Sequence, residues 1–169
     1  MCIIIVKNNN SKLEDHIVEN AVYDNQDGFG IIYLDTGEMV KTLDMLDAAT
    51  HLMSTRPFIA HCRFATVGKV KLENSHPFEV VGHDENGPVW LFMNGTINGL
   101  DCDEETDTEA LARLLEFVSP EMVAEFLDSF EARFCLYYSE LMSFKSLGIG
   151  MNITGLGSRK VTVSESRIP

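Results

Sequence analysis

The sequence predicts an α+β fold in which helices cover packed antiparallel sheets. Short apolar segments separated by turn residues occur in hairpin-like pairs, and segments with helical periodicity lie between these groups. The chain has 169 residues, 45% of them hydrophobic and 23% charged, so it can bury a substantial core. We find no internal repeat, low-complexity tract or linker rich in Pro, Gly or Ser. One domain over residues 1–169 is therefore expected.

The first half of the chain is expected to form four strands and two helices. A first helix is predicted because Leu13, Ile17 and Val18 recur on one face. The second helix should end before Pro57, because proline lacks the N–H that a helix needs. In chain order the expected elements are a strand at 2–7, a helix at 12–22, a turn at 25–30, a hairpin of strands 29–35 and 39–42, a helix at 44–55 and a strand at 57–66.

The second half is expected to contain another strand pair, two helices and a further strand. The turn residues Asp-Glu-Asn-Gly at 84–87 separate two apolar segments, which indicates paired strands. From Gly148 onward the sequence is rich in glycine and has no clear pattern. The expected elements are strands at 77–83 and 88–94, helices at 106–118 and 120–130, and a strand at 133–139.

Charge and cysteine usage exclude several classes of protein. The formal net charge is -13, from 26 acidic and 13 basic residues, which argues against nucleic acid and membrane surfaces as partners. The apolar run at 3–6 is too short for a signal peptide, and no stretch is long enough to span a membrane. The four cysteines are far apart without a CxxC pair, which indicates reduced thiols. We expect a soluble, cytoplasmic protein.

Cys2 stands directly before the first apolar strand, and three interpretations of it are open. It could be a small buried hydrophobic residue, or a lipid attachment site, although no basic patch supports an anchor. It could also be a nucleophile that becomes the first residue when Met1 is removed.

Three further polar positions have both a structural and a functional interpretation. Arg63 interrupts a buried strand, so it either forms a structural ion pair or binds an anion. Asn94 and Gly95 either form a type I′ hairpin turn or direct two hydrogen-bond donors at one oxyanion. Asp107 lies in the first turn of a helix that Thr106 would cap, and this placement needs no function.

His76 raises the question of a metal site, together with His61, Cys62 and His83. The spacing of these four residues matches no zinc pattern, and no pair of them would lie on one helix. We therefore expect no metal.

The order of the motifs resembles the class II glutamine amidotransferases, a family of N-terminal-nucleophile hydrolases. The resemblance rests on a cysteine after Met1 and on five segments, and it is strongest over residues 2–118. The segments are DGFG at 27–30, HCRFATVG at 61–68, NSHPF at 74–78, MNGTI at 93–97 and TDTE at 106–109. It implies a four-layer αββα sandwich of two antiparallel sheets, without a cofactor. The implied reaction is hydrolysis of L-glutamine to glutamate and ammonia, with ammonia passed to a synthase on another chain.

The resemblance also implies a role for individual residues. Cys2 would be the nucleophile, and Asn94 and Gly95 would form the oxyanion hole. Arg63 would bind the α-carboxylate of glutamine, and Asp107 would bind its α-ammonium group. Thr66 would lie near the carboxylate, with Phe64 and Gly68 beside it. Asp27 and Gly28 would shape the site, and His76 belongs to a typical motif of the family but has no assigned role.

An N-terminal cysteine can carry nucleophile and base on one residue. Its thiol is mostly protonated at neutral pH, and an α-amino group with a pKa of about 7.7–8.0 can accept the proton. The chain departs from the family at three positions, where Val67, Phe78 and Met93 replace frequent histidines. Two alternatives stay open: hydrolysis of another γ-glutamyl compound or small amide, and a descendant that binds without catalysis.

Overall fold

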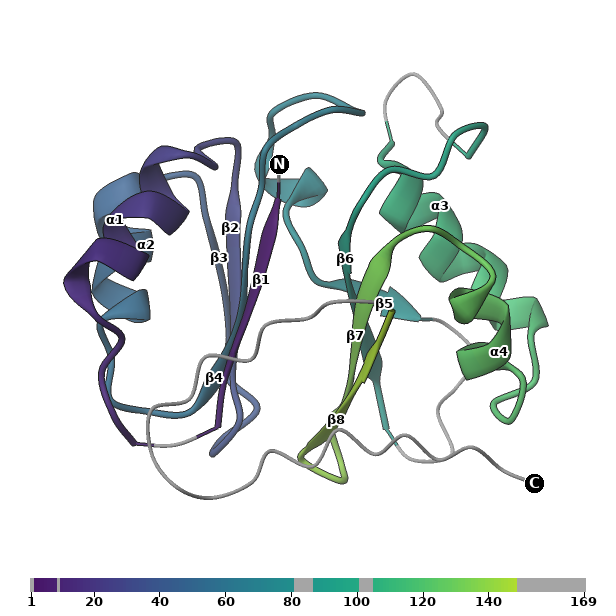
Figure 1. Ribbon diagram of the computed structural model, residues 1–169. Coiled ribbons are helices and arrows are strands. Elements are labelled where there is room, and N and C mark those ends of the chain that lie inside the picture. The colour runs from purple at the N-terminus through teal and green to yellow at the C-terminus, as the bar shows by residue number, and fades with distance from the viewer. Residues whose placement is uncertain (1, 9, 81–86, 101–104, 149–169) are drawn as a thin grey trace.

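The computed structural model shows two four-stranded antiparallel sheets that stack face to face, each covered by helices on its outer side (Figure 1). It describes residues 2–8, 10–80, 87–100 and 105–148. The expected α+β architecture, with helices over packed antiparallel sheets, is confirmed. Within the described residues, no helix combines the length and apolar character needed to cross a membrane.

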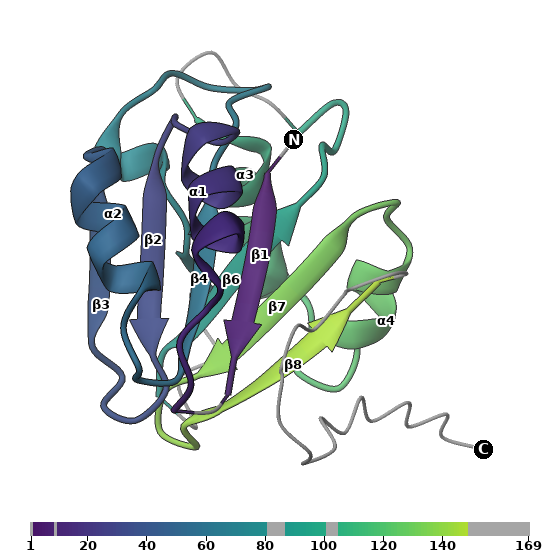
Figure 2. The same cartoon turned by 60° about the vertical axis from the view of Figure 1, so that its left-hand side comes forward.

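The first sheet is built from the N-terminal half of the chain, in the order β1-β4-β2-β3. Its central strand β4 pairs with both β1 and β2, and Ile3 lies opposite Cys62 in the register. Two helices, α1 and α2, pack side by side on the outer face (Figure 2). The bounds are β1 (Ile3–Lys7), α1 (Asp15–Tyr23), β2 (Phe29–Tyr33), β3 (Met39–Thr42), α2 (Met45–Leu52) and β4 (Phe58–Cys62).

The second sheet has the order β5-β6-β7-β8, and α3 and α4 lie on its outer side (Figure 1). Strand β8 was not among the expected strands, because its sequence SFKSL is only half-buried and lacks a strong apolar alternation. The bounds are β5 (Phe78–Val80), β6 (Val89–Asn94), α3 (Asp107–Leu114), α4 (Val123–Asp128), β7 (Arg133–Tyr138) and β8 (Ser143–Leu147), with short 3-10 turns at Leu72–Asn74 and Leu115–Phe117.

Apolar side chains form three clusters, one between the sheets and one under each helical layer. The sequence of strand β4 is apolar apart from His61, because successive side chains point to opposite faces of the sheet and both faces are buried. Phe58, Ala60 and Cys62 join the cluster under α1 and α2, whereas Ile59 joins the inner one. The same alternation directs His61 inward. The buried inner cluster consists of Val6, Ile32, Ile59, Phe92, Cys135 and Tyr137.

Several element boundaries differ from the sequence predictions. The strand expected at 57–66 ends at Cys62, because the chain then bends into a loop. The helix expected at 106–118 is α-helical only to Leu114, and the one expected at 120–130 begins at Val123. Strands β5 and β6 pair as expected. Residues 84–86 of the turn between them, and the tail after Gly148, lie outside the described residues.

The hairpin interpretation of Asn94 and Gly95 is wrong. Asn94 ends β6, whose neighbours are β5 and β7, so the chain does not turn back at Gly95 into an adjacent strand. It continues instead to α3. The glycine is needed for another reason, which the site makes clear.

Candidate active site

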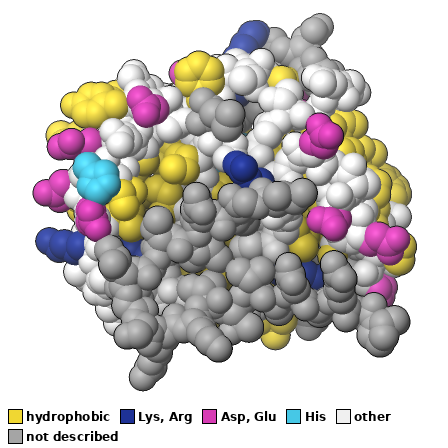
Figure 3. All heavy atoms as spheres, viewed as in Figure 1, with side chains coloured by type: hydrophobic (Ala, Val, Ile, Leu, Met, Phe, Trp, Pro, Cys, Tyr) yellow, Lys and Arg dark blue, Asp and Glu magenta, His cyan; other side chains and the backbone are white. Residues whose placement is uncertain are grey.

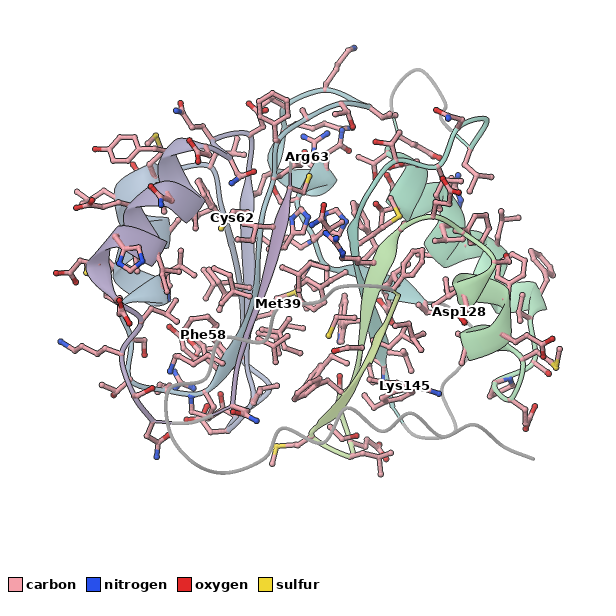
Figure 4. All side chains as sticks on the ribbon, viewed as in Figure 1. Met39, Phe58, Cys62, Arg63, Asp128 and Lys145 are labelled. Carbon is pink, nitrogen blue, oxygen red and sulfur yellow. The ribbon has the colours of Figure 1, made fainter. Side chains whose placement is uncertain are left out.

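The motif residues from four distant segments meet at one end of the stacked sheets. Because β1 and β4 are antiparallel, the residue before β1 lies beside the residue after β4. This brings Cys2 next to Arg63, which Figure 4 shows at the edge of the region between the two sheets. The end of β6 contributes Asn94, and the first turn of α3 contributes Asp107.

Two cavities meet at Cys2. An open cavity of about 900 Å³ is lined by Cys2, Phe64, Thr66, Asn94 and Gly95, with the segment 128–133 opposite them. A small cavity of about 20 Å³ adjoins it and shares Cys2, Phe64, Thr66 and Gly95. The small cavity is further lined by Arg63, His76 and Asp107. The two cavities thus bring together eight of the predicted site residues, whereas Asp27, Gly28 and Gly68 line neither cavity; the eight are Cys2, Arg63, Phe64, Thr66, His76, Asn94, Gly95 and Asp107.

The thiol of Cys2 is held against the backbone of Phe64. The Phe64 N–H donates to Sγ at 3.4 Å, and the thiol faces the Phe64 carbonyl oxygen at 3.3 Å. Burial raises the pKa of the Cys2 thiol above its ordinary value, although the Phe64 N–H and the positive charge of Arg63 act in the opposite direction. Ionisation of this thiol therefore needs a base.

Asn94 and Gly95 offer two donors without acceptors. Within the residues that the structure describes, neither the Asn94 carboxamide nor the Gly95 N–H makes a hydrogen bond. Gly95 has a φ of +151°, and a Cβ at this position would lie 2.7 Å from the Cβ of Ala132. Only glycine fits this approach, and it places Gly95 in the wall of both cavities.

Arg63 is buried, but its hydrogen bonds go to carbonyl oxygens. Arg63 as a residue is 3% exposed, and its guanidinium donates to the carbonyl oxygens of Val67 at 2.6 Å and Lys69 at 3.1 Å, with longer contacts to those of Asp27 and Gly68 at 3.4 and 3.5 Å. No carboxylate of the described segments forms an ion pair with it, so the structural salt bridge considered from the sequence is not observed. Burial lowers the pKa of Arg63, and the negative charges of Asp27 and Asp107 partly oppose this decrease.

Asp107 has a structural role in addition to lining the cavity. Its carboxylate accepts the backbone N–H of Ile97 at 2.8 Å and of Thr108 at 2.9 Å. Burial raises the pKa of Asp107, whereas these hydrogen bonds act in the opposite direction. The predicted cap is confirmed, since the Thr106 hydroxyl oxygen accepts the Glu109 N–H at 3.1 Å.

The turn at Asp27 and Gly28 holds the segment that follows β4. The Asp27 carboxylate accepts the Ala65 N–H at 2.8 Å, and the Arg63 N–H donates to the Gly28 carbonyl at 2.8 Å. A Cβ on Gly28 would lie 2.3 Å from the Ser75 Oγ, so a side chain there would displace the loop. This turn therefore shapes the site without lining it.

His61 is a residue of the site region that the sequence suggested only as a possible metal ligand. It is fully buried and stacks on His76, with ring centroids 3.8 Å apart. A histidine in an otherwise apolar strand was the signal that could have identified it. In the part of the chain described, no three His, Cys, Asp or Glu side chains gather to hold a metal ion. His83 and Cys102 lie outside that part, and Cys2, Cys62 and Cys135 are free thiols.

Both acidic and basic side chains are visible on one face of the molecule (Figure 3). Figure 3 shows acidic side chains spread over both sides of one face, with basic side chains isolated among them, which agrees with the net charge of -13. Comparison with known proteins adds no assignment, because no protein-family model and no curated protein matches the chain.

Proposed function

We propose that the chain is a class II glutamine amidotransferase subunit with the four-layer N-terminal-nucleophile hydrolase fold. It hydrolyses L-glutamine to glutamate and ammonia, and the ammonia is used by a synthase on another chain. The observation that carries this proposal is the pair of cavities at Cys2. One holds the thiol beside the unpaired donors of Asn94 and Gly95, and the other holds the thiol beside Arg63 and Asp107.

The reaction begins with the α-amine of Cys2, freed by removal of Met1. Since burial raises the thiol pKa, the amine takes the thiol proton directly or through water. The thiolate attacks the side-chain carbonyl carbon of glutamine, and the carbonyl electrons move to oxygen. Asn94 and the Gly95 N–H donate to this oxyanion, and loss of one such donor costs about 3–4 kcal/mol of barrier.

The tetrahedral intermediate collapses by breaking the C–N bond. The ammonium form of the Cys2 amine returns a proton to the leaving nitrogen, so ammonia departs and a γ-glutamyl thioester remains. Water then attacks the thioester, the same amine accepts a proton from it, and the C–S bond breaks. Glutamate leaves, and the thiol and the amine regain their starting protonation states.

Recognition of the amino-acid end falls to Arg63 and Asp107. The guanidinium fork suits the α-carboxylate, and the Asp107 carboxylate suits the α-ammonium group. A cavity of about 20 Å³ holds about one water molecule, so glutamine must displace the surrounding segment. Arg63 then exchanges its contacts with the Val67 and Lys69 carbonyls for the substrate carboxylate.

A second candidate follows from the size of the open cavity. Ammonia as a leaving group needs little space, yet the open cavity at Cys2 has about 900 Å³ and is lined by neither Arg63 nor Asp107. This volume lies in the range of small-molecule sites and favours γ-glutamyl amides with larger leaving groups. The ratio of kcat/KM for L-glutamine to that for γ-glutamyl p-nitroanilide separates the two candidates. A ratio below one favours the larger amide.

The central test is glutamate release from L-glutamine by protein whose intact mass shows that Met1 is absent. Cys2→Ala should abolish turnover without lowering the melting temperature, because the side chain lies at the start of an edge strand. Cys62→Ala is the matched control and should retain turnover, since Cys62 packs under the helices of the first sheet. Equal turnover in Cys2→Ala and the parent contradicts the mechanism. Retention of Met1 in the cellular protein, with amino-acid binding but no turnover, favours a binding protein.

A further inference from the structure

Two histidines form a stacked pair between the sheets, directly behind the candidate site. His61 lies on β4 and His76 directly precedes the Pro77 that leads into β5. The two residues are 0% and 4% exposed, their ring centroids are 3.8 Å apart and their ring planes are inclined by 36°. Phe78 closes the other side of His76 with its ring at 5.0 Å. The proposed reaction uses neither imidazole.

His61 holds the strand end that carries the two oxyanion donors. Its Nε2 lies 3.0 Å from the carbonyl oxygen of Met93, the residue before Asn94. A carbonyl only accepts, so Nε2 carries the proton and donates it. The other nitrogen, Nδ1, has no hydrogen-bond partner within the described residues, which fits a single proton on the ring. His61 thus connects the sheet that positions Cys2 to the strand that positions Asn94.

His76 holds the opposite end of the site. Its Nε2 lies 3.1 Å from the Thr108 Oγ1, and this hydroxyl lies 3.5 Å from the Asp107 Oδ1. When the hydroxyl donates to the carboxylate, Nε2 of His76 must donate to the hydroxyl. The Nδ1 of His76 is also without a partner in the described residues. In this arrangement both rings carry their single proton on Nε2, and each ring supports a different part of the site.

Burial, together with the positive charges around the pair, keeps both rings neutral. Burial lowers the pKa of His61 to about 3 and that of His76 well below its ordinary value. The positive groups facing the pair are Arg63 on both rings and Lys41 on His76, and the Asp107 carboxylate faces His76 through Thr108. A second proton on one ring would lie close to the other ring, and no carboxylate of the described residues contacts either imidazole directly.

We propose that the stacked rings of His61 and His76 are positioning residues that hold the oxyanion donors and the Asp107 carboxylate at a set separation across Cys2. His61 acts on Asn94 and Gly95 through Met93, and His76 acts on Asp107 through Thr108. The inference rests on the proposed function and deepens it, because it assigns one neutral imidazole to the oxyanion donors and the other to the Asp107 carboxylate. Misplacement of a reacting group by 1 Å can cost a rate factor of about 100.

Steady-state kinetics with glutamine separate the two roles. In His61→Leu, kcat should fall by about tenfold or more with KM within twofold, because the oxyanion donors shift. In His76→Leu, KM should rise by about tenfold with kcat within twofold, because the ammonium-binding carboxylate shifts. The glutamine variants His61→Gln and His76→Gln keep an N–H donor and should recover most of each loss. His16→Gln, on the exposed side of α1, is the control.

Two kinetic outcomes overturn the inference. In the first, both leucine variants lower kcat/KM in proportion to their decrease in melting temperature, and His61→Leu does not act mainly on kcat nor His76→Leu mainly on KM. In the second, the glutamine variants are no better than the leucine variants.

Nuclear magnetic resonance of the parent protein tests the pair without turnover. Long-range ¹H–¹⁵N spectra should show His61 and His76 as neutral rings protonated at Nε2 between pH 8 and pH 5, with exposed His16 as the comparison. The Gly95 amide should shift in His61→Leu more than in His76→Leu, with the reverse order at the Thr108 amide. A charged ring, a proton on Nδ1 or no difference between these shifts overturns the positioning roles. If glutamine is not hydrolysed but the spectra agree, the proposed function fails and the paired support of the two segments stands.

Discussion

Gly95 provides the sharpest test of how the backbone forms the cavity wall. In Gly95→Ala, the new Cβ would lie 2.7 Å from the Ala132 Cβ and 3.1 Å from its Cα, at a φ of +151°. The backbone strain contributes about 1–3 kcal/mol, and the overpacking a further ~1–3 kcal/mol. We expect Gly95→Ala to lower the free energy of unfolding by about 2–6 kcal/mol, and kcat to fall because the N–H of residue 95 moves.

Gly99 is the matched control for the strain alone. It has a φ of +86°, and a Cβ added there would meet no atom within 4 Å, so Gly99→Ala should cost only about 1–2 kcal/mol. A double-mutant cycle isolates the steric contribution. Ala132→Gly removes the Cβ that the new methyl group meets, so the double variant should be less destabilised than the sum of the single variants by about 1–2 kcal/mol.

The assay is urea denaturation followed by tryptophan fluorescence, with glutamate release measured on the same samples. Additive free energies in the Gly95→Ala and Ala132→Gly cycle would refute the contact. Equal costs for Gly95→Ala and Gly99→Ala would refute the steric argument as well. A stable Gly95→Ala protein with unchanged kcat would show that the N–H of residue 95 does not act on the oxyanion.

Three further predictions concern Arg63, the buried histidines and the buried thiols. Arg63→Lys should raise the glutamine KM and lower the free energy of unfolding by about 1–3 kcal/mol, because lysine cannot reproduce the guanidinium fork that contacts the Val67 and Lys69 carbonyls. Unchanged values of both quantities would exclude these contacts of Arg63. In the unfolded chain an imidazole is protonated below about pH 6.5, whereas burial lowers the pKa of His61 in the folded protein to about 3. Between these two pH values the unfolded state binds more protons than the folded state. The free energy of unfolding should therefore fall as the pH is lowered from about 6.5 to about 3. Denaturation across this pH range should show a smaller slope in His61→Gln than in the parent protein, and identical slopes would contradict the assignment. Burial raises the pKa of Cys62 and Cys135 to about 12, so iodoacetamide should leave both unmodified in the folded protein while it alkylates Cys2, as peptide mass spectrometry would show.

Local patterns in the sequence were sufficient to predict most of the secondary structure. The apolar runs of β4 and β6, the helical spacing before Tyr23 and the Thr106 cap depend on neighbouring residues, so they can be recognised without the fold. Strand β8 was missed because its side chains are only half-buried, and the pairing with β7 rather than its own apolar pattern makes it a strand. The boundaries near Arg63 and Leu114 failed because apolar content alone does not show where the chain bends.

The motif order identified the candidate residues, but only the tertiary structure brings them together. Cys2, Asn94 and Asp107 meet because β1 and β4 are antiparallel and because the two sheets stack on the inner apolar cluster. The carbonyl partners of Arg63 and the stacking of His61 on His76 could not be predicted, since both depend on segments distant in sequence. Local propensity is a property of a few neighbouring residues, whereas hydrogen-bond partners and cavities depend on how distant segments pack. For this reason the sequence determined the elements and their chemistry, and packing decided which groups face one another.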